Sequence, residues 1–482
     1  MMETNQTKTY PDKTDEDRRE APGIETNDTK ASYIEANYIE TLLSQIREKR
    51  ARERVRREVE SHLEDQKACY LSDGMTQEEA SRKAVADMGS PEEAGAALDR
   101  IHRPKPAWGM LAIIAALCAA GVLLQYTILK SSSLLQEGDY FFKNQLQYAV
   151  LGFAVLCIIY LLDYTVIAAY CRQLCTGILL FLFLILLQKQ MGRSGMYWLN
   201  IVRIGGFDFS ISVLFYLYVP LYGALLHSYR SCRKQDLWKI LLYTVLPVFF
   251  SLQSSVPLCL NITLILCIIL AAAILKGWLG LPVRKTALAV LAVPAALAVL
   301  FVMNLKSYQL ARLASWLNPS ADAGGAGYVP ALIRSIINSS QLVGPSTGPQ
   351  AAGFLPDCTS DYLLAYTIGQ LGILTAAALV MLVLLFGARL LHISLHQKNQ
   401  LGMIMGLGCS LVFGLQSAEF ILVNLTILPP AGVYFPLISF GGSGMIHTCI
   451  LLGLLLSIYR YENVVSEPEY KKLSTYYIVK KM

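Results

Sequence analysis

The chain has 482 residues, of which 54% are hydrophobic and only 16% are charged, and its mean hydropathy is +0.44. Such a composition excludes an ordinary soluble domain. The formal net charge of +6 fits basic loops that flank a membrane, and we expect no nucleic-acid partner. The eleven cysteines do not predict a secreted disulfide framework, because most of them lie in apolar segments or near the N-terminus.

The first hundred residues are polar and hold most of the charges. Residues 1–32 lack apolar periodicity and predict a disordered tail. Residues 33–104 predict a small cytoplasmic helical domain, with a capping box from Thr76 to Glu79 and Pro91 at the first position of a later helix. This segment resembles the prefix domain that precedes many membrane proteins of Gram-positive bacteria. We interpret it as a protein-contact or stability module.

From Trp108 onward, apolar segments of roughly 18 to 25 residues recur, which is the length that a helix needs to cross a bilayer. Backbone groups in lipid must pair internally, so these segments predict helices. We expect an all-α polytopic membrane domain over residues 105–462 and a cytoplasmic tail over 463–482. Ten spans are predicted, at residues 108–129, 145–162, 168–188, 208–227, 238–253, 257–276, 285–304, 362–388, 402–428 and 443–459.

The basic residues predict the orientation of these spans. Lys and Arg occur in the loops that follow the fourth, sixth and eighth spans, whereas the loops after the fifth and ninth spans carry none. Loops rich in Lys and Arg stay in the cytoplasm, so both termini are expected there. The chain begins without an early apolar run, and the first span is expected to serve as the insertion signal.

The segment 305–361 is the longest loop of the membrane domain and is expected on the outer face. Its acids are Asp322, Asp357 and Asp361. Asp322 is the one charged residue of the glycine-rich stretch SWLNPSADAGGAGY, residues 315–328. Aspartate beside glycine commonly closes a turn through its own side chain. A carboxylate in hydrogen-bond reach of a substrate can equally act as a general base.

The most specific string is LPPAGVYFPLISFGGSGMIHTCILLGLLLSIYR, residues 428–460. Its glycines would let non-helical backbone approach closely within the membrane, where it must be covered by protein or line a wet cavity. The alternative is a glycine kink that only packs helices. The string resembles the signature of the SEDS family, the FtsW/RodA/SpoVE-type proteins of bacterial shape, division and sporulation. The matching residues are Leu428, Pro429, Gly432, Pro436, Ser439, Phe440, Gly441, Gly442 and Ser443.

The resemblance continues, in the same order, over about residues 107–460. Gln416 stands where the family keeps a glutamine, and GMYW, residues 195–198, resembles an outer-loop motif. The large loop matches through Arg312, Pro319, Asp322, Gly327 and Tyr328, and the second and eighth spans match through Gln145, Asp163, Leu355, Pro356, Asp361 and Tyr362.

The resemblance implies a peptidoglycan glycosyltransferase that polymerises lipid II at the outer face of the bacterial cytoplasmic membrane, for elongation, division or sporulation. It implies that Asp322 is the catalytic base and that a class B penicillin-binding protein is the partner. Cations or a divalent metal, Mg²⁺ or Mn²⁺, would offset the charge of the pyrophosphate leaving group. The candidate substrate-binding residues are Lys306, Arg312, Tyr328, Arg334, Asp361, Gln416, Ser439, Gly441, Gly442 and Ser443.

Several family features are missing. Where the family has a polar opening of the fourth span, this chain has FDFSIS, residues 207–212. Where the family has paired acids in the eighth span, this chain has Gly369 and Gln370. These losses favour a second hypothesis, a non-catalytic scaffold that binds lipid-linked precursor or a penicillin-binding protein. A lipid transporter is a third, but no pair of broken helices or inverted repeat is evident. Glu419 lies inside a predicted span, so it is either functional or paired with a local polar group.

Overall fold

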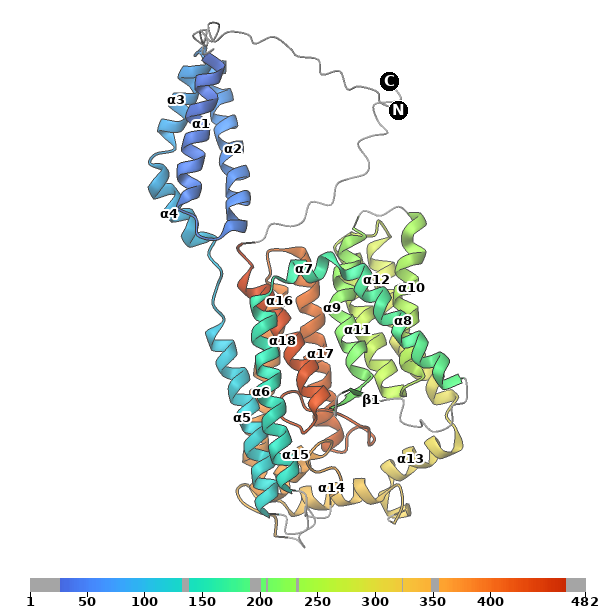
Figure 1. Ribbon diagram of the computed structural model, residues 1–482. Coiled ribbons are helices and arrows are strands. Elements are labelled where there is room, and N and C mark those ends of the chain that lie inside the picture. The colour runs from blue at the N-terminus through green and yellow to red at the C-terminus, as the bar shows by residue number, and fades with distance from the viewer. Residues whose placement is uncertain are drawn as a thin grey trace, which may run out of the picture. The chain divides into compact units, whose positions relative to one another are not determined.

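The computed structural model describes residues 27–131, 138–190, 201–204, 207–230, 234–322, 324–347 and 355–464 (Figure 1). The chain divides into two compact units, Met1–Arg103 and Pro104–Met482.

The first unit consists of four helices: α1 (Asn27–Ser44), α2 (Lys49–Ser72), α3 (Gln77–Asp87) and α4 (Pro91–Ile101). Leu42, Ile46 and Val55 are completely buried in its core. The predicted capping box is confirmed, because the Thr76 side chain accepts from the backbone N–H of Glu79 while the Glu79 carboxylate accepts from the N–H of Thr76. Helix α1 begins at Asn27, inside the range predicted to be a tail, and residues 1–26 lie outside the described residues.

The second unit is a helical bundle, and its apolar helices confirm the predicted all-α polytopic membrane fold. Among the described residues, seven helices are long and apolar enough to cross a membrane, and three shorter apolar helices accompany them. The helices are α5 (Trp108–Ser131), α6 (Gly138–Leu161), α7 (Tyr164–Ala169), α8 (Cys171–Gln190), α9 (Ser212–Ser228), α10 (Leu237–Leu252), α11 (Val256–Leu275), α12 (Val283–Met303), α13 (Ser307–Leu317), α14 (Tyr328–Ser339), α15 (Leu363–Leu371), α16 (Ile373–Leu395), α17 (Gln400–Asn424) and α18 (Gly442–Arg460), with 3₁₀ turns η1 (Lys234–Asp236) and η2 (Pro319–Asp322).

Helices α17 and α18 lie at the centre of the bundle (Figure 1). Helix α18 packs against α6 and α17, and α17 packs against α9 and α16. In its most apolar stretch, 67% of α18 is buried, against 6% of α12, so α12 lies at the periphery with its surface available to lipid. Helices α13 and α14 lie across one end of the bundle (Figure 1). We call this end, with the connecting segments 304–362 and 425–441, the loop face.

The predicted eighth span, 362–388, is not continuous. It is broken at Gly372, whose φ of +93° ends α15 before α16 begins. A Cβ atom at Gly372 would lie 2.7 Å from the carbonyl oxygen of Leu342. The chain around Leu342, which follows α14, therefore passes directly over the break. The N–H groups of Ile373 and Leu374 donate to the carbonyls of Gln341 and Leu342, both at 3.0 Å, which satisfies the backbone that the break frees.

Two further boundaries differ from the prediction. Residues 207–210 do not open the fourth span but form strand β2 (Phe207–Ser210), which pairs antiparallel with β1 (Ile201–Ile204). The ninth span ends at Asn424, because the following residues turn back into the bundle as non-helical chain. The GMYW string lies outside the described residues.

Gly372→Ala should lower the stability of the bundle. Alanine disfavours a φ of +93°, and its methyl group would collide with the Leu342 carbonyl, so we expect a loss of about 1–3 kcal/mol in the free energy of unfolding. Thermal unfolding of the detergent-solubilised protein measures the change. Gly177→Ala in α8 is the matched control, because no atom lies within 4 Å of its Cβ position. Equal melting temperatures for the two variants would contradict the interpretation.

Candidate active site

Asp322 is the exposed last residue of η2 and lies between α13 and α14 on the loop face. Its carboxylate Oδ2 accepts the backbone N–H of Ala326 at 2.9 Å. Its carbonyl oxygen accepts the N–H groups of Gly325 and Gly327, both at 3.1 Å. The turn-closing role is therefore present in the structure, and it also fixes the direction of the exposed carboxylate.

The three glycines that follow Asp322 differ in whether the structure leaves room for a side chain. A Cβ atom at Gly325 would lie 2.5 Å from Asp322 Oδ1, so any side chain there would displace the carboxylate. A Cβ atom at Gly327 would lie 2.5 Å from the carbonyl oxygen of Pro319 and would open the turn itself. At Gly324 no atom lies within 4 Å. Two of the three glycines are thus required by the geometry of the turn.

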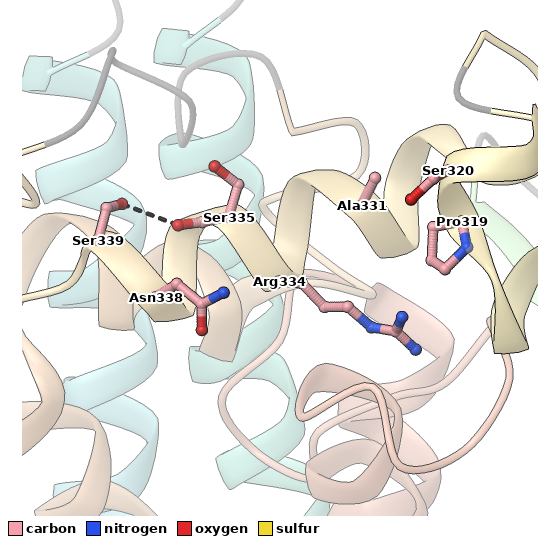
Figure 2. A pocket seen from close by; sticks show the side chains of 7 residues that line it. All are labelled: Pro319, Ser320, Ala331, Arg334, Ser335, Asn338 and Ser339. Atoms are coloured by element: carbon pink, nitrogen blue, oxygen red, sulfur yellow. Dashed lines mark hydrogen bonds between the residues drawn. The ribbon is translucent and has the colours of Figure 1, made fainter.

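Beside this turn, α14 and η2 line an open pocket with a volume of about 500 Å³, which is within the usual size of a small-molecule site (Figure 2). Arg334 points along it, and its Nη2 donates to the carbonyl oxygen of Trp316 at 2.8 Å. The pocket can therefore offer one cation and several hydroxyl and amide groups to a polar ligand. The lining residues are Pro319, Ser320, Ala331, Arg334, Ser335, Asn338 and Ser339.

A short series of hydrogen bonds connects this pocket to the membrane helices. Arg334 binds the carbonyl of Trp316 near the C-terminus of α13, and the Trp316 indole Nε1 donates to the carbonyl of Thr426 at 3.0 Å. Thr426 lies two residues beyond the end of α17 and has a φ of +57°, which is unusual for a residue other than glycine. The pocket and the end of α17 are therefore held in a fixed relation.

Asp361 lies in the turn that precedes α15. Burial, with a smaller contribution from the negative charge of Asp357, raises the pKa of this carboxyl to about 7. Asn424 fixes the turn: its Nδ2 donates to the carbonyl of Asp361 at 2.9 Å, and its Oδ1 accepts the N–H of Ala365 at 3.0 Å. The carboxylate faces Gly432, where a Cβ atom would lie 3.7 Å from Oδ2. Asp361 can thus exchange a proton near neutral pH.

The segment 425–441 is non-helical, as one of the two interpretations of the glycine-rich signature required, and its residues 433–440 are buried or half-buried, whereas Leu425, Ile427, Leu428 and Gly432 are exposed. Ser439 is completely buried, donates through Oγ to the carbonyl of Ser360 at 2.8 Å and accepts the N–H of Phe435 at 3.2 Å. Its hydroxyl is therefore used to join this segment to the Asp361 turn. Gly441, at a φ of +156°, lets Tyr434 pack over the start of α18. At Gly442, a Cβ atom would lie 2.9 Å from the ring of Tyr148.

A buried polar cluster lies beneath this segment; the sequence analysis named its Gln416 but missed His447. His447 Nε2 is 3.3 Å from Gln416 Oε1, and His447 Nδ1 is 3.1 Å from the carbonyl of Ser443. The imidazole stacks on the ring of Tyr216, with centroids 5.3 Å apart. A histidine in the apolar string that starts α18 was the available signal, since polar residues inside a span are uncommon and mostly functional.

Glu419 has the local partner that one of the two interpretations required. Its carboxylate accepts a short hydrogen bond from Nδ2 of Asn261 in α11. Both residues lie in apolar helices, so each satisfies a polar group that would otherwise be left in a dry environment.

The remaining candidates are distributed over the loop face. Lys306 precedes α13 and donates its backbone N–H to Gln309 Oε1 at 2.9 Å. Arg312 is exposed on α13. Tyr328 is the exposed first residue of α14. The structure thus places Asp322 in the same 3₁₀ turn as Pro319 and Ser320, which line the pocket with Arg334, and joins Gln416 to Ser443 through His447.

No group of three or more His, Cys, Asp or Glu side chains that could hold a metal ion occurs among the described residues. Divalent cations such as Mg²⁺ are commonly held by one or two carboxylates together with substrate phosphates. The carboxylates of the loop face would therefore hold a divalent cation only together with a ligand that supplies further oxygen atoms.

Sequence comparisons follow the membrane unit. A family model described as Cell cycle protein (FtsW/RodA/SpoVE) matches residues 108–464. A Probable peptidoglycan glycosyltransferase FtsW from Geobacter sulfurreducens is 29% identical over 370 residues, which is 72% of this chain and 94% of that protein. Another from Thioalkalivibrio sulfidiphilus is 30% identical over 345 residues, covering 68% of this chain and 82% of that protein.

Solved structures share the fold. A chain of the structure described as "Structural coordination of polymerization and crosslinking by a peptidoglycan synthase complex" superposes with a TM-score of 0.57 at 21% identity, over 74% of this chain and 98% of that chain. The rod shape determining protein RodA of Thermus thermophilus superposes with a TM-score of 0.51, also at 21% identity, over 73% of this chain and 96% of that chain.

Asp361→Asn should change the pH dependence of stability. The pKa of Asp361 is raised to about 7, so the native state holds this proton more tightly than the unfolded state does, where the pKa is 3.8. The wild type therefore loses stability as pH rises from 3.8 to about 7, and little more above it. We expect the melting temperature of the variant, relative to wild type, to rise across this window and then level off. A difference in melting temperature between variant and wild type that does not depend on pH would contradict this prediction.

Proposed function

Because the chain belongs to the FtsW/RodA/SpoVE family of cell cycle proteins, we propose that it is a peptidoglycan glycosyltransferase that polymerises lipid II into β-1,4-linked glycan. The observation that carries the proposal is Asp322, an exposed carboxylate held in a defined direction beside a polar pocket at the position of the family's loop motif. The relatives that align with most of this chain are named for the same activity.

The reaction assigns Asp322 a specific task. The 4-hydroxyl of the acceptor sugar gives its proton to the Asp322 carboxylate while its oxygen attacks the anomeric carbon of the donor. The bond from that carbon to the pyrophosphate oxygen breaks, and undecaprenyl pyrophosphate leaves with the electron pair. Attack from the opposite side inverts the anomeric centre and produces the β linkage. The protonated Asp322 then returns its proton to solvent, to which it is exposed.

The leaving group needs positive charge, since two phosphates carry the electrons released. Arg334 is the cation beside the turn, and its side chain is already oriented by Trp316. Arg312 on α13 and Lys306, which precedes that helix, are the further candidates. Mg²⁺ or Mn²⁺ would bind here through pyrophosphate oxygens together with a carboxylate, and would supply additional neutralising charge.

We place the loop face outside the bacterial cytoplasmic membrane and both termini in the cytoplasm. Support comes from the basic residues at the opposite ends of the helices, among them Lys276 after α11, Arg284 and Lys285 in the first turn of α12, and Lys398 between α16 and α17. In this orientation the pocket meets lipid-linked sugars on the outer surface, where the glycan is assembled.

We also propose a class B penicillin-binding protein as partner, which would cross-link the new strands. Support comes from the similar fold in a peptidoglycan synthase complex described as coordinating polymerisation and crosslinking. A penicillin-binding protein with a single span would find exposed apolar helices at the periphery of the bundle, of which α12 is one.

One observation favours the alternative, a non-catalytic scaffold. The residues that stand where the family has the polar opening of its fourth span form a strand here, Phe207–Ser210, and Gly369 and Gln370 replace the paired acids of the eighth. A scaffold would keep lipid II or protein binding while lacking polymerisation.

Asp322→Asn separates the two roles of this residue. The asparagine oxygen can still accept the N–H of Ala326, so the turn is retained, but the base is lost. Loss of a general base typically lowers the rate by about 10²–10⁴-fold. The measurement is lipid II polymerisation by purified protein with a cognate penicillin-binding protein, alongside lipid II binding. Glycan from wild type and none from the variant supports the enzyme. Binding by both without glycan from either identifies a scaffold.

The two neighbouring glycines give a matched pair. Gly325→Ala should displace the Asp322 carboxylate and reduce polymerisation, because the methyl group would overlap Oδ1. Gly324→Ala should leave it unchanged, because the space around that position is open. A displacement of about 1 Å can cost on the order of 10²-fold in rate. Equal activity of the two variants would show that the position of the carboxylate does not matter.

A further inference from the structure

Charge is unevenly distributed over the N-terminal unit. Residues 45–58 and 94–103 together hold nine Lys or Arg and four Asp or Glu, whereas the intervening residues 59–93 hold three and nine. We call the first set the basic end. Neither catalysis nor the helical core of this unit explains such a separation.

The fold brings the two segments of the basic end together. The backbone N–H of Arg47 donates to Asp99 Oδ1 at 3.0 Å, and a Cβ atom at Gly95 would lie 2.5 Å from the carbonyl oxygen of Leu42. The turn between α1 and α2 and the last turns of α4 therefore form one surface. Its exposed cationic residues include Arg47, Lys49, Arg56, Arg100 and Arg103.

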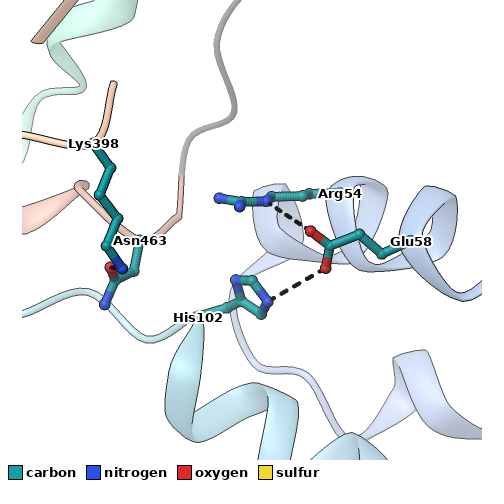
Figure 3. A network of polar contacts seen from close by, with 5 residues as sticks. All are labelled: Arg54, Glu58, His102, Lys398 and Asn463. Atoms are coloured by element: carbon teal, nitrogen blue, oxygen red, sulfur yellow. Dashed lines mark hydrogen bonds and ion pairs between the residues drawn. The ribbon is translucent and has the colours of Figure 1, made fainter. Parts of the chain in front are cut away.

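Part of the basic end is neutralised within the unit. Glu58 accepts from Arg54 at 3.4 Å and lies 3.9 Å from Nε2 of the buried His102 (Figure 3). Arg103 pairs with Asp99 at 2.7 Å. The excess of five positive charges remains after these acids are counted, so the surface as a whole is complementary to an anion-rich partner.

The position of these charges is unfavourable for α2 itself. The helix begins with Lys49 and Arg50, and its first turn holds no acidic residue. Cations at the N-terminus of a helix oppose its dipole and lower its stability. In addition, Ile101 at the end of α4 is 59% exposed. Positive charge with an exposed aliphatic side chain suits a surface that has anionic headgroups above an apolar interior.

Chain connectivity places a membrane next to this end. Only Pro104 separates Arg103 from Lys105 in the sequence. Lys105 is bound at the end of α18, because its N–H donates to the carbonyl of Arg460 at 3.0 Å and its Nζ pairs with Glu462 at 2.8 Å. Trp108 then starts the first spanning helix. The basic end is therefore juxtamembrane in the sequence, because the first spanning helix starts five residues after Arg103.

We propose that the basic end of the N-terminal unit binds anionic phospholipid headgroups on the membrane surface that α5 enters. Juxtamembrane clusters of Lys and Arg bind such headgroups, and the attraction falls off within a Debye length. The acidic residues of 59–93 are then repelled from the same surface, which orients the unit. The proposal holds whether or not Asp322 is catalytic.

A photo-crosslinking residue tests it in the full-length protein. A benzophenone amino acid replaces the exposed Ser44 beside the basic end, or Ser61 in the acidic half of α2 as the comparison position. The protein is reconstituted with equal amounts of phosphatidylcholine and phosphatidylglycerol, irradiated, and its adducts are identified by intact mass. We expect phosphatidylglycerol adducts at position 44, in excess over phosphatidylcholine, and few at position 61.

Two charge variants complete the test. Arg47→Gln with Lys49→Gln should reduce the phosphatidylglycerol adduct at least about fivefold, and high salt should do the same. Arg82→Gln with Lys83→Gln, which removes the same charge from α3, should not reduce it. Thermal unfolding confirms that each variant is folded. Cross-links from position 44 to other parts of the protein, or equal labelling of both lipids that is insensitive to Arg47 and Lys49, would overturn the proposal.

Discussion

The architecture of the loop face depends on one constraint: backbone that leaves the helical conformation inside an apolar bundle must find its hydrogen-bond partners within the protein. Gln125 of α5 donates to the carbonyl of Thr359 at 2.8 Å, and Gln145 of α6 donates to that of Ser439 at 3.4 Å. Within the described residues, the amide oxygens of both glutamines have no hydrogen-bond partner. Both glutamines thus supply N–H donors to carbonyl groups of the non-helical chain at Thr359 and Ser439.

Among the residues that the structure describes, three other than glycine have a positive φ, and they lie in the connecting segments of the loop face: Asp357 at 49°, Thr426 at 57° and Leu437 at 68°. Such conformations cost about 1–3 kcal/mol each, and they persist only where the surroundings enforce them. At Thr426 the surroundings include the hydrogen bond from the Trp316 indole, and Asp357 lies in the same turn as Asp361, which Asn424 holds. Strain and polar satisfaction are therefore concentrated beside the carboxylates at the loop face, while the centre of the bundle is regular helix.

The helices were predictable from the sequence, because hydropathy over about 20 residues reports directly on burial in lipid. The break at Gly372 was not, since it depends on a distant segment, around Leu342, that passes over it. The same limit applies at the site. The motif led to Asp322, but only coordinates distinguish Gly325, which touches the carboxylate, from Gly324, which touches nothing. His447 and Asn424 escaped notice because their partners lie on other helices.

The link between Lys105 and the end of α18 has a topological consequence. The backbone hydrogen bond from Lys105 to Arg460 holds the first and last described parts of the membrane unit side by side. Proteins whose ends adjoin commonly tolerate circular permutation. A short peptide joining the two ends could replace the natural entry point of the chain. The N-terminal unit could then be transferred to another position in the sequence without disturbing the order of helices around α18.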